Sequence, residues 1–287
     1  MKHVIFGCGD VGRRIAGQLI DNGVTKGDIL AYVNQSIEKA KSLGVVTATL
    51  NLDGDLPHLQ IGQPAQAYYT IAPQKDGVVD RRSANLIDAL QQQAVKFKRL
   101  VLISTTGVYG DCDGQWVTEQ STTQPQTERG QRRLDSEQQW FDWGRRQSVD
   151  VIVLRVPGIY AHSRLPRARI EKAVPVVNAD ECGFTNRIHA DDLAQACIQA
   201  MAYGKAGEIY NITDGTPGKI SEYLQAAAQV LGAPALPEIS MQEAQKLLSE
   251  GMLSYLGESR KISNAKMLAQ LNVVLRYPDF REGIKYG

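Results

Sequence analysis

The stretch VIFGCGDVGRRIA, residues 4–16, decides the fold of this chain. An apolar run enters a glycine-rich turn, and the turn leads into a helical pattern, which is the order strand, turn, helix. In the spacing G-x-G-x-x-G, Gly7 permits the tight turn, Gly9 lets the backbone approach a pyrophosphate, and Gly12 lets helix and strand pack closely. The N–H groups and the positive dipole end of the helix favour a diphosphate. A plain structural turn is the alternative, but this context favours nucleotide binding.

The composition is that of a globular protein with balanced charge. The 287 residues include 32 basic and 31 acidic side chains. This balance argues against a dominant electrostatic footprint, so we expect neither nucleic acid nor membrane as a partner. The four cysteines form no C-x-x-C pair and predict neither a zinc site nor a disulfide framework. The first strand follows Met1-Lys2-His3 at once, and no apolar run reaches about 18 residues, so we expect a soluble, cytoplasmic protein.

Apolar, β-rich runs alternate with helical patterns, which predicts a parallel sheet with crossover helices. The predicted strands after the first are 29–33, 45–48, 67–71, 100–103 and 151–154. The predicted helices are 11–20, 37–43, 82–93, 128–145, 221–231 and 241–248. We therefore predict an α/β fold, a Rossmann-type doubly wound parallel sheet with a small C-terminal substrate-binding lobe. Residues 1–158, completed by about 188–214, would form the nucleotide-binding domain, and 159–187 and 215–287 the smaller lobe.

The end of the second predicted strand bears on the choice of dinucleotide. NAD-selective sites place Asp or Glu there, about 20 residues past the glycines, on the ribose 2′-OH. This chain has Val33-Asn34-Gln35-Ser36 instead. Because no acid there repels a 2′-phosphate, and Arg13 and Arg14 lie just beyond Gly12, we predict NADP as the cofactor, with NAD as the alternative. A second interpretation, in which both arginines lie on a solvated helix face, stays open.

Further motifs follow along the chain. They are ISTTGVYGD at 103–111, LRVPGIY at 154–160, NRIHADDLA at 186–194 and GEIYNI at 207–212. Their order and spacing resemble the S-S-x-x-V-Y-G, R-x-x-x-I-Y-G, R-x-x-H-x-D-D-x-A and G-x-x-Y-N-V segments of the extended and atypical short-chain dehydrogenase/reductases. These are also called the NAD(P)-dependent epimerase/dehydratase family. The likeness reaches about Asp214, and the tail, RKISNAK at 260–266 before Tyr277-Pro278, resembles a bacterial atypical subgroup.

The resemblance implies a nicotinamide-dependent enzyme, and we expect its cofactor site to begin at the glycine turn. We expect the cofactor site to comprise Gly7, Gly9, Asp10, Val11, Gly12, Arg13, Asn34, Gln35, Asn51, Leu52, Ile71, Ala72 and Pro157.

The chain departs from the family at its acid/base dyad. Alignment with Y-G-x-S-K-L-x-x-E puts Arg129 where the family has Tyr and Arg133 where it has Lys, and none of the eleven tyrosines has a lysine four residues later. Arginine is a poor proton donor, but its planar fork of donors binds anions well. We therefore name Arg129 and Arg133 as candidate catalytic residues that bind a carboxylate or phosphate, with Arg155 or Arg164 as further partners. The alternative places both on the solvated face of the 128–145 helix, beside Arg132 and Gln138.

Other polar residues complete the set of candidates. Thr105 matches the position of the family's catalytic Ser, and Tyr109 could supply a phenol if it faces the pocket. A strand-end Thr and a packed Tyr are the structural alternatives. His189 and Asp191-Asp192 suggest a metal pair, but Asp at a helix start is a capping signal, so we predict no metal site. His162 is the other histidine that a pocket-facing loop would carry.

Two functions remain open. One is an NADP-dependent oxidoreductase or epimerase/dehydratase-like enzyme acting on a small carbonyl or hydroxyl compound, with an anionic compound as one substrate class. The other is a non-catalytic NADP(H)-binding sensor or regulatory protein. By analogy with related folds, the helices at 82–93 and 128–145 are compatible with a homodimer.

Overall fold

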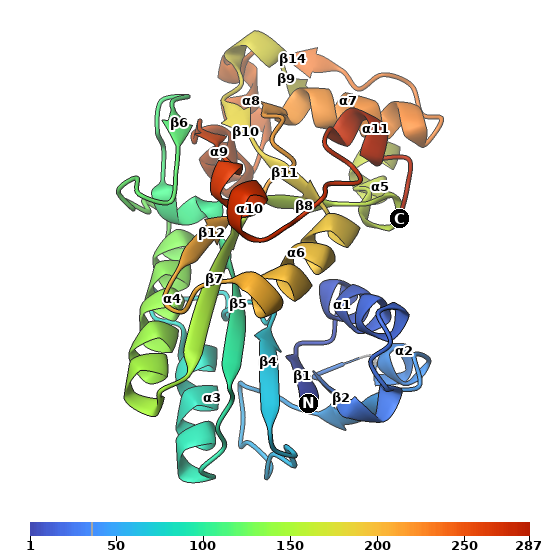
Figure 1. The fold of residues 1–287 in the computed structure, drawn as a ribbon. Coiled ribbons are helices and arrows are strands. Elements are labelled where there is room, and N and C mark those ends of the chain that lie inside the picture. Colours follow the sequence, from blue (N-terminus) through green and yellow to red (C-terminus); the bar gives the residue numbers. More distant parts are fainter. Residues whose placement is uncertain (36) are drawn as a thin grey trace.

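The computed structural model describes residues 1–35 and 37–287, so Ser36, quoted above at the end of the second strand, lies outside the described residues. A seven-stranded sheet forms the centre of the molecule (Figure 1). Its order is β12-β7-β5-β4-β1-β2-β3, and all its neighbouring strands run parallel. The strands are β1 (Lys2–Phe6), β2 (Ile29–Val33), β3 (Val46–Thr49), β4 (Ala65–Tyr69), β5 (Arg99–Thr105), β7 (Asp150–Val156) and β12 (Ile209–Asn211). This arrangement confirms the predicted doubly wound α/β fold.

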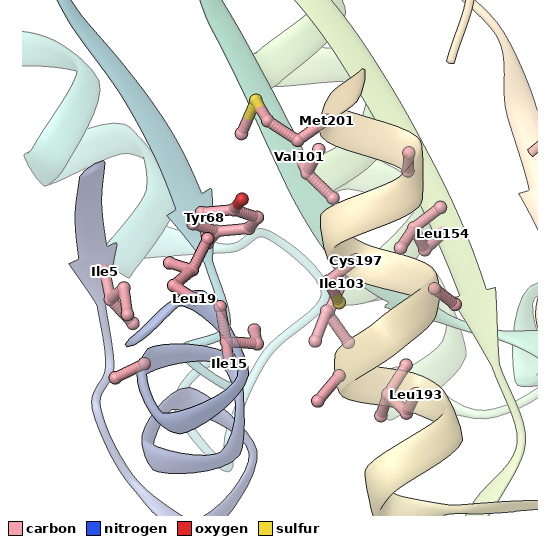
Figure 2. Packing of buried hydrophobic residues seen from close by; sticks show 14 of the residues in the cluster. Ile5, Ile15, Leu19, Tyr68, Val101, Ile103, Leu154, Leu193, Cys197 and Met201 are labelled. Carbon is pink, nitrogen blue, oxygen red and sulfur yellow. The ribbon is translucent and has the colours of Figure 1, made fainter. Parts of the chain in front are cut away.

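Helices cover both faces of the sheet. One face carries α1 (Asp10–Asp21), α2 (Ile37–Lys41) and α6 (Ala190–Tyr203), and the other carries α3 (Arg81–Gln92) and α4 (Glu128–Gln147). Figure 2 shows α1 and α6 packed on the first face, with Leu19 of α1 near Ile5 of β1 and Met201 of α6 near Val101 of β5. The apolar positions recur at helical spacing, and their burial fixes the two helices on the sheet.

A smaller lobe lies beyond the carboxyl ends of the strands (Figure 1). Its pairs of short strands are β8 (Gly158–Tyr160) with β11 (Arg187–His189), β9 (Val176–Val177) with β14 (Glu238–Ile239), and β10 (Phe184–Thr185) with β13 (Gly218–Lys219). β6 (Trp116–Val117) pairs with β15 (Lys261–Ile262). The helices are α5 (Arg167–Glu171), α7 (Ile220–Val230), α8 (Met241–Leu247), α9 (Glu250–Leu256), α10 (Ala265–Gln270) and α11 (Phe280–Gly283). The 3-10 helices are η1 (Lys26–Asp28), η2 (Thr106–Tyr109), η3 (His162–Arg164) and η4 (Ala179–Glu181).

The lobe has its own apolar core, separate from the two layers that flank the sheet. Tyr160, Leu224 and Phe280 are among its buried members, and they come from β8, α7 and α11. A continuous core of this kind lets the lobe hold a rigid surface against the sheet edge. That edge, where parallel strands end, is where open α/β sheets bind ligands.

Candidate functional site

The glycine turn lies at the point where the strand order reverses, between β1 and β4. Gly7 has a φ of +93°, and a Cβ there would lie 2.7 Å from Cγ1 of Ile71. A Cβ on Gly12 would lie 2.7 Å from the Gly7 carbonyl oxygen, whereas one on Gly9 would meet nothing nearer than that oxygen at 3.9 Å. The turn therefore needs Gly7, close packing needs Gly12, and Gly9 borders open space. This geometry fits a diphosphate beside the start of α1.

Arginines surround the first turn of α1. Asp10 accepts a hydrogen bond of 2.8 Å from Arg164 of η3, and its carboxylate lies 3.5 Å from Nε of Arg14 and 3.8 Å from Nη2 of Arg13. Partial burial acts to raise the pKa of Asp10, but the hydrogen bond from Arg164 and the nearby arginine charges outweigh it, so the pKa is below its usual range. The carboxylate is thus ionised and its charge is balanced.

Arg14 also pairs with Asp191 and donates to Oγ of Ser163 at 3.0 Å. Arg14 therefore joins α1 to α6 and to the loop of the smaller lobe. Arg14 is therefore engaged in contacts between elements, and its part in the choice of dinucleotide stays a prediction.

A cavity of about 240 Å³, here called the glycine-loop cleft, opens beside the turn. It is lined by Gly7, Cys8, Gly9, Tyr32, Val33, Asn34, Gln35, Leu50, Leu52, Asp53, Ile71 and Arg82. Six residues of the expected cofactor set are among these. Of the others, Asp10, Val11, Gly12 and Arg13 form the first turn of α1, Ala72 and Pro157 line other cavities, and Asn51 accepts the backbone N–H of Asp53 at 3.1 Å.

The cleft also contains residues that the sequence analysis missed. Arg82, in the first turn of α3, donates to both carboxylate oxygens of Asp53, with Nε at 2.7 Å, and to the Ala72 carbonyl at 2.9 Å. The hydrogen bond from Arg82 is the main cause of a lowered pKa at Asp53. Burial raises the pKa of Cys8 to about 11, so its thiol stays protonated. No local motif marks Asp53 or Arg82, since the fold alone brings these two residues together.

Two more cavities lie at the carboxyl ends of the strands. The arginine cavity, of about 490 Å³, is lined by Ala72, Pro73, Gln74, Lys75, Thr105, Gly107, Arg129, Gly130, Arg132 and Arg133. The lobe cavity, of about 280 Å³, is lined by Thr105, Thr106, Gly107, Arg129, Pro157, Gly158, Phe184, Thr185, Asn186, Tyr255, Glu258 and Arg260. Thr105, Gly107 and Arg129 belong to both, so the two cavities adjoin at the carboxyl end of β5.

Three of the four candidate catalytic residues line these cavities. Arg133 is partly buried, and its Nη1 donates to the carbonyl oxygens of Ile71 at 3.3 Å and Ile103 at 3.1 Å. The solvated-face alternative is therefore wrong for Arg133. Arg129 is exposed and lies with its guanidinium 6.0 Å from the ring centre of Tyr255 in α9. The Thr105 hydroxyl accepts the backbone N–H of Gly107 at 3.2 Å and still borders both cavities.

The fourth candidate, Tyr109, lies elsewhere. Its side chain is 1% exposed, and its hydroxyl donates to Oδ1 of Asn211 at 2.8 Å. Burial raises its pKa, so the phenol is a poorer acid than usual. In the described part of the chain, Tyr109 lines none of these three cavities. This favours the alternative that Tyr109 packs as a structural residue. The guanidinium of Arg155 lies 4.8 Å from the Tyr109 ring centre, and Arg155 pairs with buried Glu137 at 2.8 Å, so it is not free to hold a ligand.

The histidine segment has structural contacts. Nδ1 of His189 accepts the Asp191 N–H at 3.2 Å at the start of α6. Asp192 accepts the backbone N–H groups of Arg276 at 3.0 Å and Tyr277 at 2.9 Å, which fixes the C-terminal segment. Nε2 of His162 lies 3.0 Å from Arg167. Among residues 1–35 and 37–287, no group of three or more His, Cys, Asp or Glu side chains is placed to hold a metal ion. None of the helices described there has the length and apolar character needed to cross a membrane.

Comparisons with known proteins agree with this architecture. Protein YeeZ of Escherichia coli K12 is 25% identical, and the alignment covers 97% of each chain. The structure of a functionally unknown conserved protein from Silicibacter pomeroyi is 28% identical with a TM-score of 0.84, and covers 98% of this chain and 96% of that one. UDP-glucuronic acid 4-epimerase of Bacillus cereus, solved with NAD, shares the fold at 15% identity and a TM-score of 0.77, covering 99% and 96%.

A family model matches the middle of the chain. Residues 81–213 match the model of the NAD dependent epimerase/dehydratase family. This range contains α3, α4, β5, β7 and β12, and all four motif segments that carried the resemblance lie wholly in it. The doubly wound sheet and its lobe agree with this match, so the middle of the chain is similar to the NAD dependent epimerase/dehydratase family.

Proposed function

We propose that this protein is an NAD(P)-dependent oxidoreductase or epimerase/dehydratase-like enzyme that acts on a small carbonyl or hydroxyl compound. The observation that carries the proposal is the glycine turn, in which Gly9 borders open space at the N-terminus of α1 beside a cleft. When bound, a nicotinamide cofactor supplies the hydride chemistry. The chain's part is to bind and orient: the glycine turn holds the diphosphate, and Thr105 offers a hydroxyl to a substrate oxygen at the adjoining cavities.

For the cofactor we propose NADP, and the arginine on which we base the proposal is now a different one. Asn34 and Gln35 line the glycine-loop cleft without a carboxylate at the end of β2. The cation that lines the cleft is Arg82 rather than Arg13 or Arg14. Arg82 shares its charge with Asp53, and a 2′-phosphate on this side of the cleft would compete with that carboxylate for the guanidinium.

The experiment is a titration of the purified protein with NADPH, NADH, NADP⁺ and NAD⁺ by calorimetry or nucleotide fluorescence. We expect NADPH to bind at least about tenfold more tightly than NADH, because one charged hydrogen bond contributes about 1.5–3 kcal/mol. Asn34→Asp should reverse the order, since its carboxylate repels a 2′-phosphate and accepts from a 2′-OH. Equal binding of both nucleotides by the wild type would contradict the NADP preference, and no binding at millimolar concentration would overturn the cofactor site.

A second candidate function, a non-catalytic NADP(H)-binding sensor, is favoured by one observation. The alignment made from the sequence puts Arg129 and Arg133 at the positions of the family's acid/base dyad, and neither guanidinium transfers a proton at working pH. A screen of carbonyl and hydroxyl compounds with the bound nucleotide separates the two, because only the enzyme changes nucleotide absorbance at 340 nm on turnover. We also propose a homodimer that pairs through α3 and α4, and light scattering of the purified protein would test it. The location that we propose for the protein is the cytoplasm.

A further inference from the structure

The arginine cavity has an unusual charge. Four of its lining side chains are cationic: Lys75, Arg129, Arg132 and Arg133. In the described part of the chain, no Asp or Glu lines it. Charges of one sign around a partly enclosed space raise the local potential, because the low-dielectric walls screen them poorly. Such a cavity favours an anion.

The four cations do not contribute equally. Arg132 is buried, donates to the Gly77 carbonyl and lies 3.4 Å from Glu128, so it has a structural role. Arg133 is different, because its hydrogen bonds go to the neutral carbonyls of Ile71 and Ile103, which orient the guanidinium. The carboxylates of Asp80 and Glu137 act on its charge from a distance, but in the described part of the chain neither forms a hydrogen bond with it. A partly buried charge that neutral groups hold in place gains from an oxyanion partner.

The cavity is distinct from the expected place of the cofactor's own phosphates. The glycine-loop cleft lies beside the N-terminus of α1, and its lining residues include none of those that line the arginine cavity in the described structure. Its cation, Arg82, is paired with Asp53. The arginine cavity instead adjoins the lobe cavity through Thr105, Gly107 and Arg129, where Phe184 and Tyr255 offer aromatic surface.

We infer that the arginine cavity binds the oxyanion of the substrate, a carboxylate or a phosphate, through Arg129 and Arg133. The inference rests on the proposed function and names its substrate class: a small carbonyl or hydroxyl compound that carries an acid group. The rest of the molecule extends past Thr105 into the lobe cavity. In this chain the two positions of the acid/base dyad therefore recognise the charge of the substrate.

The test uses inorganic phosphate and malonate as probes, titrated by calorimetry at low ionic strength with and without saturating nucleotide. Arg129→Gln and Arg133→Gln remove one charge each. Arg146→Gln is the matched control, because Arg146 is exposed near the end of the same helix and lines none of these cavities. We expect Arg129→Gln and Arg133→Gln each to weaken the preferred probe at least about tenfold, the effect of losing one charged hydrogen bond. The control should stay within about twofold of the wild type, because exposed charges are largely screened. The preferred probe identifies the acid group as phosphate or carboxylate.

Unchanged probe affinity in both arginine variants would overturn the inference, as would loss of probe binding when nucleotide saturates, because the cavity would then belong to the cofactor. If Arg133→Gln fails to fold, Arg129→Gln decides alone, since Arg129 is exposed. The two proposals fail separately. A wild type that binds nucleotide but no probe loses the oxyanion site, whereas one that binds the probe through these arginines but no nucleotide loses the proposed function.

Discussion

At the scale of single residues, the three glycines of the turn have different roles: two are needed for packing and one leaves space for a ligand. Gly7 and Gly12 are required by packing, whereas a side chain on Gly9 would enter open space. We therefore predict that Gly9→Asp abolishes dinucleotide binding, because its carboxylate meets the pyrophosphate, while the melting temperature stays near that of the wild type. Gly17→Asp adds the same charge at an open position of α1 and should retain nucleotide binding in the same titration. Unchanged affinity in Gly9→Asp would rule out this cofactor site.

At the scale of secondary-structure elements, long periodic segments could be predicted from sequence. The strand at 29–33 and the helix start at 128 agree with β2 and α4. β2 is a short apolar run that is buried on both faces, whereas α4 buries residues at helical spacing. The two-residue strands of the lobe carry too few residues to show a period, so β9 and its partner β14 were not predicted. The candidate site divides in the same way. The glycine turn is local in sequence, whereas the pairing of Asp53 with Arg82 arises from tertiary packing.

A buried ion pair joins three elements beneath the candidate site. Glu137 of α4 accepts from Arg155 of β7 at 2.8 Å and from the Ser104 hydroxyl of β5. Both charged side chains are at most 4% exposed. We predict that Arg155→Met lowers the free energy of unfolding by about 3–5 kcal/mol, because it leaves Glu137 buried without its partner. The double variant Glu137→Leu with Arg155→Met should recover most of that loss. Urea denaturation measures both, and a single variant that costs less than about 1 kcal/mol would show that the pair is not fully desolvated.

At the scale of the whole molecule, polar contacts join the lobe to the sheet. Arg164 of η3 reaches Asp10 of α1, and Asp192 of α6 holds the backbone of the C-terminal segment. A third contact follows β12, where the Asp214 N–H donates to the Arg187 carbonyl of β11 at 2.8 Å and one carboxyl oxygen accepts from Thr216 at 3.1 Å. The lobe cavity borders this junction, since it is lined by Gly158 of β8 and by Asn186, which precedes β11. Changes in charge at this junction between lobe and sheet should therefore change the free energy of unfolding of the protein.

Asp214 at this junction should make the stability of the protein depend on pH. Its side chain is buried, its second carboxyl oxygen has no hydrogen-bond partner among the described residues, and burial raises its pKa to about 8. Between its unfolded pKa of about 3.9 and that value, the folded protein holds a proton that the unfolded chain releases. Stability should therefore fall as pH rises through this window, by up to about 1.4 kcal/mol per pH unit. Urea denaturation from pH 5 to 8 measures the slope. Asp214→Asn resembles the protonated acid and cannot titrate, so we expect it to gain stability relative to the wild type as pH rises. Parallel profiles for the two proteins would mean that Asp214 is ionised in the folded state throughout.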